Sequence, residues 1–423
     1  MVRYFDRLEK LEILADSARY DVSCPPREST GLNLHIHHKR TLPGGICHSW
    51  SDNGRCIALL KILLSNVCIY DCAYCINRRS NDIPRITMSV NEMVDLTLTL
   101  HRKNYIQGLF LSSGIWRSAD WTMECLARVA EILRFRHGFG GYIHLKVIPG
   151  ADPRLIARAS RVANRLSVNI ELPTEVSLLN LAPDKSKQKI LTPMRQVSEI
   201  VMENYEERRR HPSSPMPAPT GQTTQLIIGA SPENDQQVLQ LAEALYHRYG
   251  LKRVYYSGYV PLNRDSRLPA LESPPALREH RLYQADWLIR LYGFNVSELF
   301  DEDHKNLEEP LDPKTSWALR HPQFFPIEVN QADYERLLRV PGIGINSARR
   351  ICSSRRSGTL RYEDLSKFGV VMKKARFFLT INGRYHGGHS WEPGAAEATL
   401  SAESIEWTQR QAKGRFWQQL RLF

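Results

Sequence analysis

Short apolar runs alternate with longer amphipathic stretches over most of the chain. Six runs have the length and the Val, Ile, Leu and aromatic content of strands, and they cover residues 57–64, 108–112, 142–148, 166–172, 224–228 and 253–259. Between them, apolar residues recur at helical spacing, as in residues 90–102, 123–136 and 235–249. The alternation predicts an α/β protein with a parallel sheet.

Repetition of strand and helix closes most readily into a full or partial barrel. With six strands we expect a partial (β/α)6 barrel of the TIM type over residues 56–300. A doubly wound open sheet is the alternative. In a barrel the chemistry lies at the carboxyl ends of the strands, so the residues that follow each strand are the first candidates for a site.

The flanking segments have a different pattern. Residues 1–55 predict an amphipathic helix followed by an irregular extension, and residues 206–223 an exposed insertion rich in charge and proline. Residues 301–326 are expected to be a linker. Helical stretches separated by glycine turns predict a small all-α module at residues 327–382, and residues 383–423 predict a poorly ordered tail.

Composition and charge restrict the functional classes. Of 423 residues, 42% are hydrophobic and 24% charged, which is typical of a globular protein. The apolar run at residues 57–64 is short and contains Lys61, and the start of the chain lacks the apolar stretch of a signal peptide, so we expect a cytoplasmic protein with no membrane partner.

Positive charge is concentrated near the end of the chain. The net charge is +12, and residues 331–423 hold 16 Lys and Arg against 8 Asp and Glu, or +8. A basic module of this kind predicts a polyanionic partner such as nucleic acid. A solvated basic face is the alternative.

Three of the eight cysteines form a tight cluster. Cys68, Cys72 and Cys75 follow the first predicted barrel strand with the spacing C-x3-C-x2-C. Three thiolates on one loop can bind three irons of a [4Fe–4S] cluster and leave the fourth iron open. A closed zinc site needs four ligands, and catalytic zinc more often recruits His, which this loop lacks. A zinc knuckle or three incidental cysteines is the alternative.

The cysteine spacing resembles the signature of the radical S-adenosylmethionine (SAM) superfamily, in which an aromatic residue precedes the last cysteine, as Tyr74 does here. The resemblance implies a [4Fe–4S] cluster, SAM as cofactor, a 5′-deoxyadenosyl radical and an electron donor such as a flavodoxin or ferredoxin. More closely, the chain resembles a family of radical SAM proteins described as acting in DNA modification or repair. Residues 59–63, 76–82, 108–115, 141–146 and 166–172 carry that likeness.

The same resemblance implies SAM contacts on later strand ends. Ser112, Ser113 and Gly114 end the second strand, where the superfamily often has Gly-Gly-Glu instead. Asn169 and Glu171 leave the fourth strand, and Gly229 ends the fifth, where it would admit the adenine. Ordinary strand-end polarity or turn chemistry explains each of these residues equally well.

A glycine turn in the basic module is suited to phosphate binding. Gly342 and Gly344 permit a tight turn before a helix whose first N–H groups can bind an anion, and Arg349 and Arg350 lie on that helix. The run resembles helix-hairpin-helix nucleic-acid-binding modules, and a weaker second copy carries Lys373 and Lys374. An αα-hairpin that only packs on the barrel is the alternative.

The leading hypothesis is a radical SAM enzyme that modifies or repairs nucleic acid, with DNA expected. A non-catalytic DNA-binding iron–sulfur protein with a redox or repair-complex role and a tRNA-modifying radical SAM enzyme stay open. Cys24, Cys47 and Cys56 could bind a second metal, although their irregular spacing favours buried free thiols. Cys125 and Cys352 are expected to be packing residues.

Overall fold

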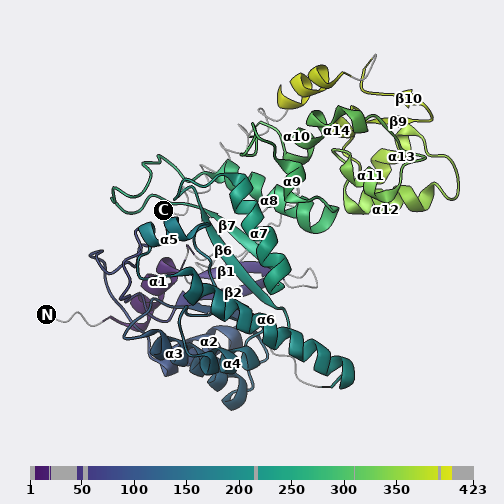
Figure 1. Cartoon of the computed structure of the whole chain (residues 1–423). Coiled ribbons are helices and arrows are strands. Elements are labelled where there is room, and N and C mark those ends of the chain that lie inside the picture. Colours follow the sequence, from purple (N-terminus) through teal and green to yellow (C-terminus); the bar gives the residue numbers. More distant parts are fainter. Residues whose placement is uncertain are drawn as a thin grey trace. The chain divides into compact units, whose positions relative to one another are not determined.

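The computed structural model describes residues 5–18, 20, 45–50, 56–213, 218–308, 310–388 and 392–402 (Figure 1). The chain divides into two compact units. The first comprises Met1–Glu233 with Leu241–Glu279, and the second comprises Asn234–Gln240 with His280–Phe423. Over the described part of the chain, every helix is too short or too polar to cross a membrane. The boundaries expected at residues 55, 300 and 326 stay predictions.

A seven-stranded sheet forms the centre of the first unit, and its strands lie side by side in chain order. Strands β2 to β7 are parallel, whereas β1 pairs antiparallel with β2. A doubly wound sheet would reverse its strand order part-way, and this sheet does not. The first unit is therefore a curled half-barrel. The strands are β1 Ile46–Trp50, β2 Cys56–Leu63, β3 Gly108–Ser112, β4 Tyr142–Lys146, β5 Arg165–Ser167, β6 Gln222–Ile228 and β7 Arg253–Gly258.

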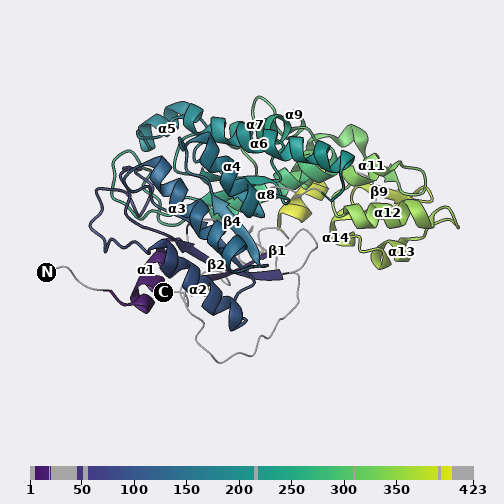
Figure 2. The same cartoon turned by 90° about the horizontal axis from the view of Figure 1, so that it is seen from below.

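Helices connect the parallel strands and pack against their neighbours in chain order, with α2 on α3, α3 on α4 and α4 on α6 (Figure 2). Local sequence explains where they begin. Ser89 caps α2 and forms a capping box with Glu92. The helices are α1 Arg7–Ser17, α2 Val90–Arg102, α3 Ala119–Glu131 with a π-helical turn Ile132–Arg136, α4 Pro153–Val162, α5 Glu175–Leu181, α6 Lys187–Arg210 and α7 Asp235–Tyr249.

The structure differs in part from the predictions for residues 206–223 and for residues 1–55. The insertion expected at residues 206–223 begins inside α6, which ends only at Arg210, because the run of Glu and Arg residues there continues a helix. Residues 214–217 of it lie outside the described residues. Of the extension predicted for residues 1–55, α1 and β1 are described, whereas residues 21–44 and 51–55 are not.

The second unit is mostly helical but holds a three-stranded sheet in the order β10-β9-β8, so the expectation of an all-α module is wrong. These strands have two or three residues each, too few to show an alternating pattern in the sequence. The elements are α8 Ala276–Tyr292, α9 Val296–Leu299, α10 Pro313–Arg320, η2 Pro322–Phe324, β8 Ile327–Glu328, α11 Tyr334–Arg339, α12 Ile345–Ser354, α13 Tyr362–Lys367, α14 Met372–Ala375, β9 Leu379–Ile381 and β10 Arg384–Tyr385.

The segment expected to be a linker, residues 301–326, is folded over much of its length. It contains α10, and Trp317 of that helix is buried against Phe294 and Phe325. A buried indole ring is typical of a folded segment, because its burial contributes stabilisation, whereas a flexible linker would leave the ring exposed. Of the tail expected at residues 383–423, β10 and a helical stretch at residues 393–402 are described, and residues 403–423 lie outside the described part.

Candidate functional site

A cavity of about 190 Å³ opens at the carboxyl ends of the parallel strands of the first unit. Because parallel strands run in one direction, their carboxyl ends meet at a single rim. Residues at the ends of all six parallel strands contribute to the wall of the cavity. The residues that line it are Ser17, Tyr20, Leu63, Cys68, Tyr70, Cys72, Tyr74, Cys75, Ile76, Asn77, Ser113, Gly114, Ile115, Lys146, Val147, Ile148, Pro149, Asn169, Glu171, Lys185, Gln225, Ile227, Ser257, Gly258, Tyr259, Val260 and Leu262.

The three clustered cysteines lie on the loop that follows β2, residues 64–82, called the cysteine loop below. All three thiols are free and line the cavity, with Cys72 buried and Cys68 and Cys75 half-buried. Burial raises the pKa of Cys72 to about 11 and that of Cys75 to about 12. A bound metal ion reverses this preference, because it deprotonates a coordinating thiol. The thiols thus lack the lowered pKa that is typical of nucleophilic cysteines.

The arrangement of the three thiols is compatible with a cluster. Within the described residues, no three or more His, Cys, Asp or Glu side chains are grouped so as to hold one metal ion. A [4Fe–4S] cluster does not require such a group, because each thiolate binds a different iron. Two polar atoms beside the thiols, Tyr74 Oη and Asn77 Oδ1, are buried without a hydrogen-bond partner among the described residues. Such atoms in a cavity wall leave hydrogen-bonding capacity for a polar ligand or a water molecule.

A buried ion pair crosses the cavity wall. The Lys185 ammonium donates to Glu171 Oε1 over 2.7 Å, and their side chains are 13% and 10% exposed. Burial is the largest influence and disfavours the charged lysine, but the Glu171 carboxylate together with Tyr74 and Cys72 raises the pKa of Lys185. Glu171 has a φ of +66°, which is unusual for a residue other than glycine. Strained backbone of this kind is found at ligand sites, where the surrounding structure holds it in place.

The other residues predicted to contact SAM divide into two groups. Ser113, Gly114 and Asn169 line the cavity with Glu171 and Tyr74. Ser112 is buried within β3, and Gly229 is not part of the wall. A Cβ at Gly229 would lie 2.9 Å from Pro275 Cγ, and its φ is +84°, so local packing and backbone account for this glycine without a ligand.

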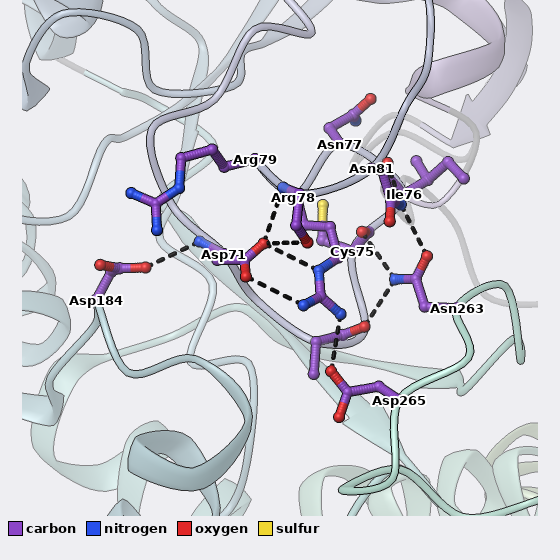
Figure 3. A network of polar contacts seen from close by, with 12 residues as sticks. Asp71, Cys75, Ile76, Asn77, Arg78, Arg79, Asn81, Asp184, Asn263 and Asp265 are labelled. Carbon is purple, nitrogen blue, oxygen red and sulfur yellow. Dashed lines mark hydrogen bonds and ion pairs between the residues drawn. The ribbon is translucent and has the colours of Figure 1, made fainter.

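An arginine next to the triplet ties the cysteine loop to the chain that follows β7 (Figure 3). Arg78 donates from Nε and Nη2 to the two carboxylate oxygens of Asp71, over 2.9 and 3.1 Å. Its Nη1 donates to Asp265 Oδ2 over 2.8 Å. Hydrogen bonds from Arg78 hold the pKa of Asp71 well below its usual range, and those from Arg267 do the same for Asp265. The carboxylates are therefore charged at neutral pH.

An asparagine and a second arginine bind the backbone of the same loop. Asn263 Nδ2 donates to the carbonyls of Ala73 and Cys75, over 2.7 and 3.0 Å, while its Oδ1 accepts from Asn81. Arg85 donates to four carbonyl groups, those of Asn66, Asn77, Arg78 and Asn81. These bonds satisfy carbonyls that an irregular loop cannot pair internally.

The glycine turn of the second unit joins α11 to α12. Gly342 has a φ of +87°, and Gly344 precedes α12 without a side-chain cap. Arg349, Arg350 and Lys373 are exposed. Lys374 forms an ion pair with Asp312, and its contact with nucleic acid stays a prediction.

The remaining cysteines are described only in part. Cys47 is half-buried, Cys24 lies outside the described residues, and so does the side chain of Cys56. The second metal site therefore stays a prediction.

Several residues of the site could not be picked out in the sequence. Lys146 and Lys185 line the cavity, and Arg78 and Asn81 lie in residues 76–82, where the sequence resembles a family but has no motif that assigns them a role. Asn263 follows β7 in a proline-rich segment with no motif of its own. Its partners are more than 180 residues away.

No known family profile and no curated protein matches this chain. Among solved structures, the hydrogenase maturase HydG aligns over 53% of this chain with a TM-score of 0.41 and 14% identity. Methylornithine synthase PylB aligns over 66% of this chain and 67% of its own length, with a TM-score of 0.37 and 15% identity. HemN from Escherichia coli, described as a radical SAM enzyme, aligns over 53% of this chain and 50% of its own length, with a TM-score of 0.33 and 14% identity. The chain spans about half the length of HydG, 48%. At these values the likeness carries no information on chemistry, which must come from the residues of this chain.

Proposed function

We propose that the protein is a radical SAM enzyme that modifies or repairs a nucleic acid. One observation carries the first half of this proposal: three cysteines with the spacing C-x3-C-x2-C line a cavity at the carboxyl rim of a half-barrel. Cys68, Cys72 and Cys75 would hold a [4Fe–4S] cluster. When bound with SAM, such a cluster would supply the one electron needed to cleave SAM into methionine and a 5′-deoxyadenosyl radical.

The protein's own residues would bind and enclose the cofactor. Tyr74 Oη and Asn77 Oδ1 have unused hydrogen-bonding capacity beside the thiols. Asn169, Glu171 and Ser113 supply further polar groups on the wall. The apolar side chains of the wall, such as Ile115, Val147 and Ile227, exclude water from the reaction.

The test is cleavage of SAM. Protein purified without oxygen is loaded with iron and sulfide, reduced with dithionite and mixed with SAM, and 5′-deoxyadenosine is measured. The expected result is formation by the wild type and by Cys125→Ala, and none by Cys72→Ala. Cys125 lies on α3 outside the cavity, so its loss should leave the cluster intact. A reducible cluster that gives no 5′-deoxyadenosine, with or without nucleic acid, would instead favour a non-catalytic iron–sulfur protein.

The nucleic-acid half of the proposal depends on the second unit. Arg349 and Arg350 are exposed on α12, directly after the uncapped turn at Gly344. Cations of this kind contact phosphates, so we expect binding that is largely independent of sequence and weakens with salt. DNA is the proposed polymer, and structured RNA is the alternative that a competition experiment separates.

Salt titration tests this interface. Removing both arginines as Arg349→Gln with Arg350→Gln should lower the slope of log K against log salt by about 2. The matched control is Arg208→Gln with Arg209→Gln, which removes the same charge from the exposed end of α6 in the first unit. Equal slopes for the two double variants would rule out α12 as the binding surface. The electron donor is proposed to be a flavodoxin or ferredoxin, which reduction assays with purified donors would test.

A further inference from the structure

The segment that follows β7, residues 259–268, does two things at once. Tyr259, Val260 and Leu262 form part of the cavity wall. Asn263 and Asp265, one and three residues further on, bond to the cysteine loop. Hydrogen bonds from Asn263, which directly follows the wall residue Leu262, therefore connect the cavity wall to the backbone between Cys72 and Cys75.

These bonds cross the open side of the half-barrel. β2 and β7 are the first and last strands of the parallel set, so no ladder hydrogen bond joins them. The loops after these two strands nevertheless meet, with Asn263 Nδ2 only 2.7 Å from the carbonyl oxygen of Ala73. The cysteine loop is consequently held from the far edge of the sheet as well as by its own strand.

Arg78 makes this connection with a geometry that lysine could not reproduce. Two of its nitrogens bind both oxygens of Asp71, and a third binds Asp265, while its side chain is only 11% exposed. A planar guanidinium can bridge two carboxylates with fixed directions, whereas an ammonium is a point charge on a flexible stem. The neighbouring Arg79 is exposed, and its Nη1 donates to the carbonyl of Ile69 over 3.5 Å. Figure 3 shows its side chain away from Asp265.

We propose that Arg78 and Asn263 are positioning residues, which hold the cysteine loop in the shape that binds the cluster and couple that shape to the cavity wall. The proposal rests on the function proposed above. Neither residue needs to touch the cluster. Their effect passes through Asp71 and Asp265 and through the carbonyls of Ala73 and Cys75.

The experiment compares two adjacent arginines under the same change. Full-length wild type, Arg78→Lys, Arg79→Lys and Asn263→Ser are loaded with iron and sulfide without oxygen. Iron loss to a chelator, the EPR spectrum of the reduced cluster with and without SAM, and the cluster's midpoint potential are then measured. We expect Arg78→Lys and Asn263→Ser to lose iron about tenfold faster or more, with altered spectra and potentials, because charge-assisted and backbone bonds to the loop are gone. Arg79→Lys should match the wild type.

The outcomes separate the two proposals. If the wild type binds no cluster, the proposed function fails. If the wild type binds one and Arg78→Lys and Asn263→Ser behave like Arg79→Lys, the positioning role alone is overturned. Circular dichroism of the metal-free variants identifies misfolding, and Asn263→Ser still decides the question if Arg78→Lys does not fold. A change in stability without a change in spectrum or potential would also overturn the proposal.

Discussion

Substitution of the two turn glycines in the second unit should have very different effects. Gly342 has a φ of +87°, and a Cβ there would lie 2.6 Å from the carbonyl oxygen of Val371 and 3.1 Å from the amide nitrogen of Ala375. Gly344 has a φ of −96°, and the nearest atom to its Cβ would be Tyr292 Oη at 3.6 Å. The same change to alanine therefore clashes with backbone atoms at one position and makes an ordinary van der Waals contact at the other.

The magnitude follows from two costs and one gain. Left-handed backbone costs alanine about 1–2 kcal/mol, and overpacking costs about 1–3 kcal/mol. Loss of glycine's freedom in the unfolded chain returns about 0.4–1 kcal/mol. We expect Gly342→Ala to destabilise the turn by about 2–4 kcal/mol. Gly344→Ala loses only the preference for glycine over alanine at a helix N-cap, about 1 kcal/mol or less.

Hydrogen exchange of peptides that cover α11 and α12 measures the destabilisation of the turn between them. A local measurement is needed because a chain of two units need not unfold in one step. An opening energy lower by about 2–4 kcal/mol corresponds to exchange about 30- to 700-fold faster. Equal exchange rates in Gly342→Ala and Gly344→Ala would refute the reasoning, because the contact with Val371 would then not constrain the turn.

Three further predictions concern buried charge and close packing. Burial would raise the pKa of Asp312, but Lys374 outweighs it and lowers this pKa to about 2. The pKa of Asp312 is higher in the unfolded chain. About 1–2 kcal/mol of the stability present at neutral pH should therefore disappear as the pH falls from about 4 to 2. Urea unfolding should show that loss in the wild type and a flatter acid limb in Asp312→Asn. Burial lowers the pKa of Lys314 to about 7, so the unfolded state binds more protons between that pH and about 10.5, and stability should rise with pH across this window. Lys314→Met should abolish the rise, and an unchanged slope would contradict it. In β3, a Cβ at Gly108 would lie 2.3 Å from the carbonyl oxygen of Tyr142, whereas one at Gly140 would meet nothing within 4 Å. Gly108→Ala should therefore lower the melting temperature markedly, and Gly140→Ala should not.

The fold of the first unit was largely predictable because its strands are buried on both faces. The six apolar runs correspond to β2–β7, and α2 and α7 have the predicted bounds, Val90–Arg102 and Asp235–Tyr249. β1 was missed because it lies in a stretch with no apolar alternation, and its pairing with β2 is a tertiary interaction. In the second unit, the two- and three-residue strands could not be predicted, because they are too short to show an alternating pattern.

The site was predictable only where neighbouring residues define it. The strand pattern indicated the rim on which Cys68, Cys72 and Cys75 lie, whereas the chemistry that their spacing predicts stays a prediction. Partners distant in sequence could not be inferred, as with Asn263 at the cysteine loop. Lys374 shows the same limit, because its pairing with Asp312 depends on a contact across 62 residues.

The bonds across the open side of the half-barrel also set an order in time. Asn263 and Asp265 are made 187 to 190 residues after their partners in the cysteine loop. At about 5–20 residues per second, a ribosome needs roughly 10–40 s to cover that interval. Throughout it, the thiols are already synthesised while the residues that bind their loop from the far edge do not yet exist. A complete cysteine loop is therefore a late product of synthesis, available only after β7 and the segment behind it have emerged.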